Sequence, residues 1–225
     1  MNQPANTEMP KTWPMFRAMG GIGLLCGVLI VATYQITLPV IEGNKAEFLE
    51  QAIFNVLPGA VASETFLLTP TGDFDKLETE DAAGEKIYAG YDSTGDLIGV
   101  AIEARGMGFQ DAIVVLYGYA PEREIVVGIQ VLESRETPGL GDKIEKDPDF
   151  LRNFDALDVA LAGDAQTLAN PIVPVKKGEK QHPWEIDAIT GATISSNAIA
   201  AILRESTTHW VPKVKEHLNA FQKGR

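Results

Sequence analysis

An uncharged run of 24 residues, 18–41, constrains this chain more than any other feature of its sequence. As an α-helix, such a run reaches roughly 36 Å, enough to cross a bilayer core of about 30 Å with some tilt. Its first half, 20–31, is strongly apolar, whereas its second half carries hydroxyl and amide side chains and Pro39, which suit an outer interface and a helix exit. Length and position near the N-terminus favour a transmembrane helix over a buried helix of a soluble protein.

The run is interpreted as a retained anchor rather than a removable signal peptide. No small-x-small cleavage site follows the apolar core, and Leu25 is too large to precede Cys26 at a lipoprotein processing site. Lys11 and Arg17 precede the run, whereas glutamates surround the first lysine after it, which favours an inside N-terminus. The predicted parts are a cytoplasmic tail at 1–17, a transmembrane helix at 18–41 and an extracytoplasmic domain at 42–225.

A separate amphipathic helix is expected to follow the anchor. Asn44 can cap this helix together with Glu47, three residues further on, and an apolar stripe follows. Pro58-Gly59 ends the pattern. The next stretch, 60–85, is acidic and rich in turn residues, with weak strand signals.

Runs of β-forming residues then predict a mainly antiparallel sheet. Turn residues join 86–91 to 97–103 and 112–119 to 125–132, so each pair reads as a hairpin. The second pair is apolar enough for central strands. The mixed order lacks regular βαβ alternation, which indicates an α+β fold. The remaining expected elements are a short helix at 148–156, a strand at 184–189, and helices at 195–207 and 213–222, on either side of Pro212.

Composition excludes several classes of function. Apolar residues make up 45% of the chain and charged residues 22%, which fits a packed globule, and a net charge of −12 argues against nucleic-acid binding. The single cysteine, Cys26, excludes an internal disulfide, a cysteine zinc site and a cysteine-ligated iron–sulfur cluster. The histidines are scattered, and Pro212 separates His209 from His217, so no metal site is expected.

The stretch Asp187–Asn197 places two threonines and two serines around a glycine turn at an expected helix start. Unpaired backbone N–H groups and the positive end of the helix dipole favour a phosphate there. The alternative is an ordinary helix start, with Thr193 or Ser195 as the cap. Thr-Gly-Ala-Thr alone is too short to decide between the two.

Two further glycine turns accompany this stretch. The first, 105–110, follows a strand but lacks the third glycine of a dinucleotide fingerprint, so Gly106 and Gly108 provide either a tight connection or a close approach to a flat ligand. In the second, Glu136 and Thr137 offer hydrogen bonds, and Gly139-Leu140-Gly141 offers an apolar backbone shelf. Together these residues suit a heteroaromatic ring with polar edges.

Six motifs occur in one order along the chain: Thr37-x-Pro39-x-Ile41-x-x-Asn44, Leu57-Pro58-Gly59, Gly90-Tyr91-Asp92, Gly106-x-Gly108, Glu136-Thr-Pro-Gly-Leu-Gly141 and Asp187-x-x-Thr-Gly-Ala-Thr193. Taken together, these motifs resemble the RnfG family, the flavin-carrying component of the Rnf electron transport complex. This family belongs to the FMN-binding-domain proteins, which also include NqrC of the sodium-pumping quinone reductase. RnfG is favoured because the chain joins its motifs without a long insertion.

The resemblance implies FMN covalently attached through its phosphate to Thr193. Gly191 and Ala192 would give access to a separate flavin transferase that uses FAD, and Ser195 and Ser196 would face the phosphate. Asp187 and Thr190 would be recognition or ring contacts. The other expected cofactor-binding residues are Glu136, Thr137, Gly139, Leu140, Gly141, Gly106 and Gly108. A separate hypothesis is that the Arg105 guanidinium stabilises the anionic reduced ring.

The resemblance also implies a place in the bacterial inner membrane, in a complex that passes electrons between ferredoxin and NAD and moves ions. This chain would relay electrons with the other Rnf subunits as partners, and would not be a complete enzyme by itself. Three alternatives remain open: NqrC, a tethered sensory or scaffold domain without electron-transfer duty, and a soluble flavin enzyme acting on a small substrate.

Overall fold

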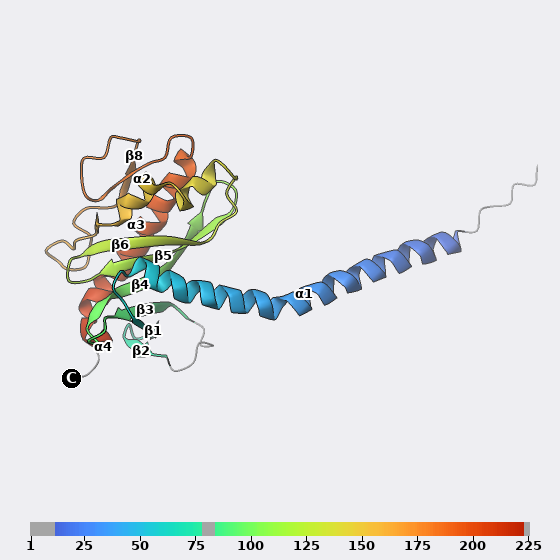
Figure 1. The fold of residues 1–225 in the computed structure, drawn as a ribbon, viewed down its shortest axis with the longest axis horizontal. Helices are drawn as coiled ribbons and strands as arrows, with labels where there is room; N and C mark the ends of the chain where they lie inside the picture. Colours follow the sequence, from blue (N-terminus) through green and yellow to red (C-terminus); the bar gives the residue numbers. More distant parts are fainter. Residues whose placement is uncertain (1–11, 78–83, 223–225) are drawn as a thin grey trace, which may run out of the picture. The chain divides into compact units, whose positions relative to one another are not determined.

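The computed structural model describes residues 12–77 and 84–222, and the chain divides into two units, 1–47 and 48–225. Helix α1, Trp13–Val56, is a single helix of 44 residues, drawn in Figure 1 from blue to cyan. It is long and apolar enough to cross a membrane, and its most apolar window is 0% buried. Figure 1 also labels helices and strands of the second unit, which is described by itself below.

The expected helix start at Asn44 is wrong, because α1 continues through both Pro39 and Asn44. Pro39 lacks the N–H that would bond one turn back, but the flanking residues keep helical geometry. The amphipathic stripe is correct in position, since Ala52, Ile53 and Val56 are buried. The stripe therefore forms the last turns of the long helix rather than a second helix.

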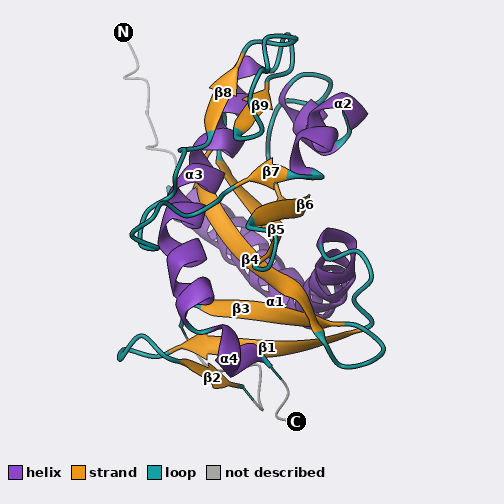
Figure 2. Ribbon diagram, turned by 90° about the vertical axis from the view of Figure 1, so that its left-hand side faces the viewer, coloured by secondary structure: helices purple, strands orange, loops and turns teal. Residues whose placement is uncertain are grey.

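A seven-stranded sheet with only antiparallel neighbours forms the centre of the second unit, in the order β2-β1-β3-β4-β5-β6-β7. Figure 2 shows its strands in orange, with α3 along one side. This confirms the α+β class and both predicted hairpins. The strands are β1 Ala62–Leu68, β2 Phe74–Lys76, β3 Lys86–Tyr91, β4 Leu97–Met107, β5 Ala112–Ala120, β6 Ile125–Glu133 and β7 Leu157–Asp158.

The end of α1 packs on one face of this sheet, against Ala101 and Leu116. Glycines on four adjacent strands allow this close approach. A Cβ added to Gly118 would lie 1.9 Å from the Val56 carbonyl oxygen, and one added to Gly128 would lie 3.0 Å from the same oxygen. The backbone of α1 therefore rests almost directly on the backbone of the sheet. An added Cβ would lie within 4 Å of Val56 or Leu57 at each of four glycines: Gly90, Gly99, Gly118 and Gly128.

Helix α3, Thr193–Glu216, packs on the opposite face and shares the main hydrophobic core with β3, β4 and β5. The prediction of two helices separated at Pro212 is wrong, because α3 runs through this proline and is followed by the short helix α4, Leu218–Phe221. Trp210, Val211 and Val214 are buried on both sides of Pro212. Their packing outweighs the one backbone hydrogen bond that proline cannot donate.

The remaining elements lie between β6 and α3 in the chain. The helix expected at 148–156 is α2, Pro148–Leu151, followed by a 3₁₀ turn η2, Arg152–Phe154. An earlier 3₁₀ turn, η1, spans Gly141–Glu145. The strand expected at 184–189 is shorter: β9, Glu185–Asp187, pairs in parallel with β8, Val173–Val175, outside the main sheet.

Candidate functional site

A pocket of about 340 Å³ lies at the N-terminus of α3. It brings together two segments that are far apart in the sequence, the Glu136–Gly141 turn and the start of α3. Most of the residues that the sequence singled out line it. The lining residues are Phe109, Glu136, Thr137, Leu140, Gly141, Gly191, Ala192, Thr193, Ile194 and Ser195.

Thr193 is the first residue of α3 and is exposed. The preceding turn places Gly191 at φ +83°, a conformation that glycine adopts without strain. The alternative in which Thr193 or Ser195 caps the helix is wrong, because Ala192 occupies the N-cap and provides no side-chain hydrogen bond. The Thr193 hydroxyl is therefore not used as the helix cap and stands at the positive end of the helix dipole.

Ser195 and Ser196 are buried, at 2% and 0% exposed, and their hydroxyls point into the protein. Ser195 Oγ donates to Glu136 Oε2 at 2.5 Å. Ser196 Oγ donates to the Ala192 carbonyl at 2.9 Å and accepts from the Ile189 N–H at 3.1 Å. Through their hydroxyls, both serines thus join the start of α3 to the rest of the fold.

Glu136 connects three parts of the site. The residue is only 6% exposed, and its Oε1 accepts from the backbone N–H groups of Phe109 and Gln110 at 2.8 and 3.1 Å. Its other oxygen accepts from Ser195 at 2.5 Å. The β4–β5 turn, the Glu136 turn and α3 are thereby held by one buried carboxylate. This contact could not be read from the sequence, since its partners include backbone groups of a distant turn.

The Glu136–Gly141 turn is closed by its own backbone and by a side chain that the sequence did not single out. The Thr137 carbonyl accepts from the N–H groups of Leu140 and Gly141 at 3.1 and 3.0 Å. Asp142 accepts from the N–H of Gly139 at 2.6 Å, where Gly139 has φ +78°. A hydrogen bond from Lys146 holds the pKa of Asp142 below its ordinary value. The ionised carboxylate thus fixes the turn.

Gly106 and Gly108 serve packing in this structure and do not line the pocket. A Cβ at Gly106 would lie 2.5 Å from Ile202 of α3. A Cβ at Gly108 would lie 2.4 Å from a Glu136 carboxylate oxygen and 2.7 Å from Ile113. Of the two interpretations left open, the structure therefore supports the tight connection.

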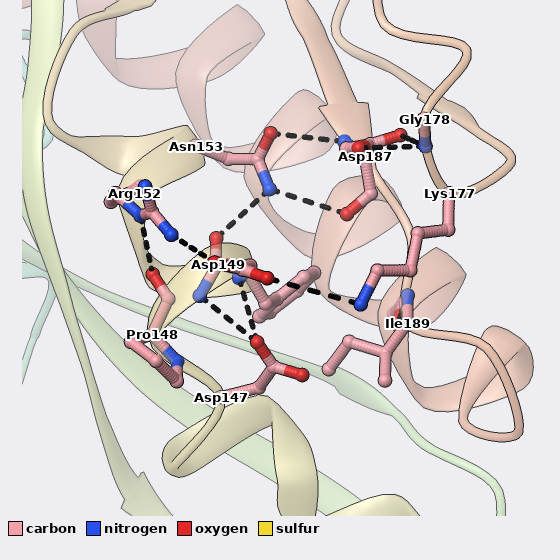
Figure 3. A network of polar contacts seen from close by, with 11 residues as sticks. Asp147, Pro148, Asp149, Arg152, Asn153, Lys177, Gly178, Asp187 and Ile189 are labelled. Carbon is pink, nitrogen blue, oxygen red and sulfur yellow. Dashed lines mark hydrogen bonds and ion pairs between the residues drawn. The ribbon is translucent and has the colours of Figure 1, made fainter.

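Asp187 and Thr190 are near Thr193 in the chain but do not line the pocket. Both carboxylate oxygens of Asp187 accept from the N–H of Gly178, at 2.7 and 2.9 Å (Figure 3). Thr190 is exposed on the turn. Figure 3 also shows Asn153 facing the backbone of Asp187. Asn153 is buried and was missed, because a lone asparagine in a short helix carries no signal in the sequence.

Arg105 lines a different pocket, of about 300 Å³, with Glu205, His209 and Trp210 among its neighbours. It does not line the pocket beside Thr193, so the hypothesis that Arg105 stabilises a ring held there finds no support in the geometry. Within residues 12–77 and 84–222, no group of three or more histidine, cysteine, aspartate and glutamate side chains is placed to hold a metal ion.

Residues 108–207 match the family described as FMN-binding domain. The chain is 30% identical to the G subunit of the ion-translocating oxidoreductase complex of Methanosarcina acetivorans, over 84% of this chain and 88% of that protein. It is also 30% identical to the corresponding protein of Cereibacter sphaeroides, over 84% of this chain and 80% of that protein. The G subunit of the Na⁺-translocating ferredoxin:NAD⁺ oxidoreductase complex of Acetobacterium woodii is 26% identical, with 80% and 82% covered.

Solved structures share the fold at lower identity. The crystal structure of Shewanella oneidensis NqrC has a TM-score of 0.57 and 19% identity, covering 80% of this chain and 96% of that one. The C subunit of the Na⁺-translocating NADH-quinone reductase from Parabacteroides distasonis has a TM-score of 0.61 and 19% identity, with 83% and 96% covered. Identity, coverage and the FMN-binding-domain match together show that the chain belongs to the family formed by the G subunits of ion-translocating oxidoreductase complexes.

Proposed function

We propose that this chain is a membrane-anchored flavoprotein subunit that carries FMN covalently on Thr193 and relays electrons within an Rnf-type ion-translocating ferredoxin:NAD oxidoreductase complex. The observation that supports this most directly is the position of Thr193, an exposed residue at the start of α3 that lines a pocket together with residues of the Glu136–Gly141 turn. The names of the relatives and the FMN-binding-domain match support the same proposal.

The residues of the pocket fit a flavin. Phe109, Leu140 and Ile194 are 61%, 52% and 59% exposed around it, and such exposed apolar side chains suit a flat aromatic ring. Thr137 and backbone groups of the turn supply polar contacts. The volume of about 340 Å³ falls within the range of about 300–1,000 Å³ typical of cofactor pockets. Bound there, FMN supplies the electron-carrying chemistry.

An exposed threonine can act as the acceptor in covalent attachment. In the proposed step, Thr193 Oγ displaces AMP from the FMN phosphorus of FAD. One O–P bond forms, the pyrophosphate P–O bond breaks, and the hydroxyl proton passes to a base of a separate flavin transferase. Gly191 lies close to the acceptor in the chain, and nothing stands within 4 Å of a Cβ added there, which leaves the transferase room to approach.

A covalent bond also solves a problem of retention. The N-terminus of a helix contributes about 0.3–1 kcal/mol to holding a negative charge. Micromolar binding needs about 8 kcal/mol, and a flavin released outside the cytoplasm would be lost by dilution. The phosphoester bond removes dissociation as a route of loss.

The proposed location is the outer side of a bacterial inner membrane, with α1 as the single span and residues 1–17 in the cytoplasm. Lys11 and Arg17 before the uncharged run support this orientation. The proposed partners are the other subunits of the complex, which bind ferredoxin and NAD. Purification of the native complex and identification of its subunits by mass spectrometry would separate an Rnf assembly from a quinone reductase.

The attachment site is tested with the full chain co-expressed with a flavin transferase. Flavin fluorescence that survives a denaturing gel is expected for the wild-type chain and for Thr190→Ala, and is expected to disappear in Thr193→Ala. Thr193→Ser retains a hydroxyl and is expected to keep some label. Covalent fluorescence that persists in Thr193→Ala, or that never appears in the wild-type chain, would contradict the proposal.

A further inference from the structure

The segment that carries the proposed acceptor begins at an unpaired strand edge. β9 pairs with β8 on one side, where the Ala188 N–H donates to the Val175 carbonyl at 2.9 Å. The N–H and C=O of Asp187 face the other side, away from β8, where no further strand of the described residues pairs with β9. Backbone N–H and C=O groups at such an edge need hydrogen-bond partners from the protein where water is excluded.

Asn153 provides these partners. Its Oδ1 accepts from the Asp187 N–H at 3.0 Å, and its Nδ2 donates to the Asp187 carbonyl at 3.2 Å (Figure 3). One side-chain amide thus makes the pair of bonds that a neighbouring strand would make. Asn153 is 5% exposed, so these bonds form away from competing water.

The Asn153 amide makes two further hydrogen bonds. Nδ2 donates to the Phe150 carbonyl at 2.9 Å, and Oδ1 accepts from Lys180 Nζ at 3.1 Å. The reversed orientation of the amide would place its NH₂ against two donors, so the network itself fixes which way the side chain points. Asn153 therefore holds Asp187 in one orientation.

The other end of the segment is held by Ser196, which bonds to the Ile189 N–H and to the Ala192 carbonyl. Asp187 and Ala192 are thus fixed from opposite ends. Between them, Thr190 and Gly191 are exposed, and Thr193 follows directly. The position of the Thr193 hydroxyl consequently depends on both attachments.

We propose that Asn153 is a positioning residue for flavin attachment: by holding the backbone of Asp187, it keeps the acceptor segment in the conformation that presents Thr193 to the transferase. This inference rests on the proposed function. It also assigns Asp187 a role within the Asp187–Thr193 motif. Its carboxylate bonds to Gly178 and its backbone to Asn153, so Asp187 anchors the segment instead of contacting the flavin.

The test measures the single-turnover rate of FMN transfer to the purified full chain at saturating transferase and FAD. Asn153→Ala is expected to lower this rate roughly tenfold, because two bonds that order the acceptor segment are lost. Asn153→Asp retains the acceptor for the Asp187 N–H but loses the donor to its carbonyl, and is expected to give an intermediate rate. Saturation separates acceptor positioning from weaker binding of the transferase.

Val126→Ala provides the matched control, since Val126 is a fully buried core residue of β6 outside the acceptor segment. It is expected to lower stability but to leave the transfer rate of the folded chain unchanged. Hydrogen exchange supplies an independent readout: Asn153→Ala should accelerate exchange at 186–193 selectively, whereas Val126→Ala should not.

The outcomes separate the two proposals. If the wild-type chain accepts flavin on Thr193 and Asn153→Ala accepts it at the same rate, the positioning role is wrong while the proposed function stands. The positioning role is also wrong if Asn153→Ala and Val126→Ala lower the transfer rate equally for an equal loss of global stability. If the wild-type chain accepts no flavin on Thr193, the proposed function itself is wrong, and the positioning role falls with it.

Discussion

Ser195 and Glu136, 59 positions apart in the chain, are joined by a buried hydrogen bond from the serine hydroxyl to the glutamate carboxylate. This contact connects the first turn of α3 to the turn that forms the opposite wall of the pocket. The same carboxylate accepts from the backbone of Phe109 and Gln110. The shape of the pocket therefore depends on one side chain.

Glu136→Ala is expected to lower the free energy of unfolding by about 2–4 kcal/mol, because three donors lose their acceptor. Urea or guanidinium denaturation measures the change. The control is Glu122→Ala, whose exposed carboxylate is expected to contribute less than about 0.5 kcal/mol. Equal effects of the two substitutions would show that Glu136 does not hold the site together.

Gly118→Ala is expected to destabilise the fold by about 1–3 kcal/mol, since the new methyl group would collide with the Val56 carbonyl. Gly163→Ala is the matched control, because nothing lies within 4 Å of its added Cβ. Thermal or chemical unfolding of both variants measures the difference. A Gly118→Ala chain as stable as Gly163→Ala would mean that α1 does not pack on the sheet as described.

Removal of the hydroxyl is expected to affect stability differently at two buried tyrosines of β5, Tyr117 and Tyr119. The Tyr117 hydroxyl bonds to Ser206 at 2.9 Å, whereas that of Tyr119 finds no partner among the described residues. Tyr117→Phe is expected to lower the free energy of unfolding by about 1 kcal/mol. Tyr119→Phe is expected to leave it unchanged or to raise it by about 1 kcal/mol, because an unpaired buried hydroxyl is removed. Reversal of this order in equilibrium unfolding would contradict the assignment.

The ion pair of Glu124 and Lys215 predicts a dependence of stability on pH. Their charged atoms lie 2.8 Å apart, and the hydrogen bond from Lys215 holds the pKa of Glu124 below its ordinary value of 4.5. The pair therefore stabilises the fold above pH 4.5, and this contribution is lost as the pH falls through the lowered pKa. Glu124→Gln should reduce stability at neutral pH, with a difference from wild type that shrinks in acid.

Unfolding measured from neutral pH to well below the carboxyl pKa tests this dependence. Glu122→Gln serves as the control, because its side chain is exposed on the same turn. Its difference from wild type should stay small and flat across the range. A Glu124→Gln difference that did not change with pH would rule out the ion pair as its cause.

The sequence predicted the elements whose signals are local. Both hairpins have strand-forming runs on either side of turn residues, and each lies where expected. Pro212 and Asn44 misled the prediction, because each is a local signal for a helix boundary. Packing of the neighbouring apolar residues keeps α3 continuous at Pro212, whereas α1 continues through Asn44 along an exposed stretch.

The sequence indicated which residues line the candidate site better than it indicated the contacts that these residues make. The motifs led to Glu136, Thr137, Leu140 and Thr193, which do line one pocket. The direction of the Ser195 hydroxyl could not be predicted, because it depends on a carboxylate that only the folded chain brings near. The role of Asn153 could not be predicted either. Its partner is the backbone of Asp187, and a contact with backbone leaves no residue-specific pattern in the sequence.

The glycines of the sheet that lie against the last turns of α1 affect how the second unit can be separated from the rest of that helix. Val56 and Leu57 lie against the glycines of β3 to β6, and Ala52 and Ile53 belong to the same buried cluster. A soluble form cut after Val56 would expose the rest of this cluster to water and to other chains. A form without the exposed part of α1 should therefore begin at or before Phe48, where the second unit begins, because the final turns of α1 belong to that unit.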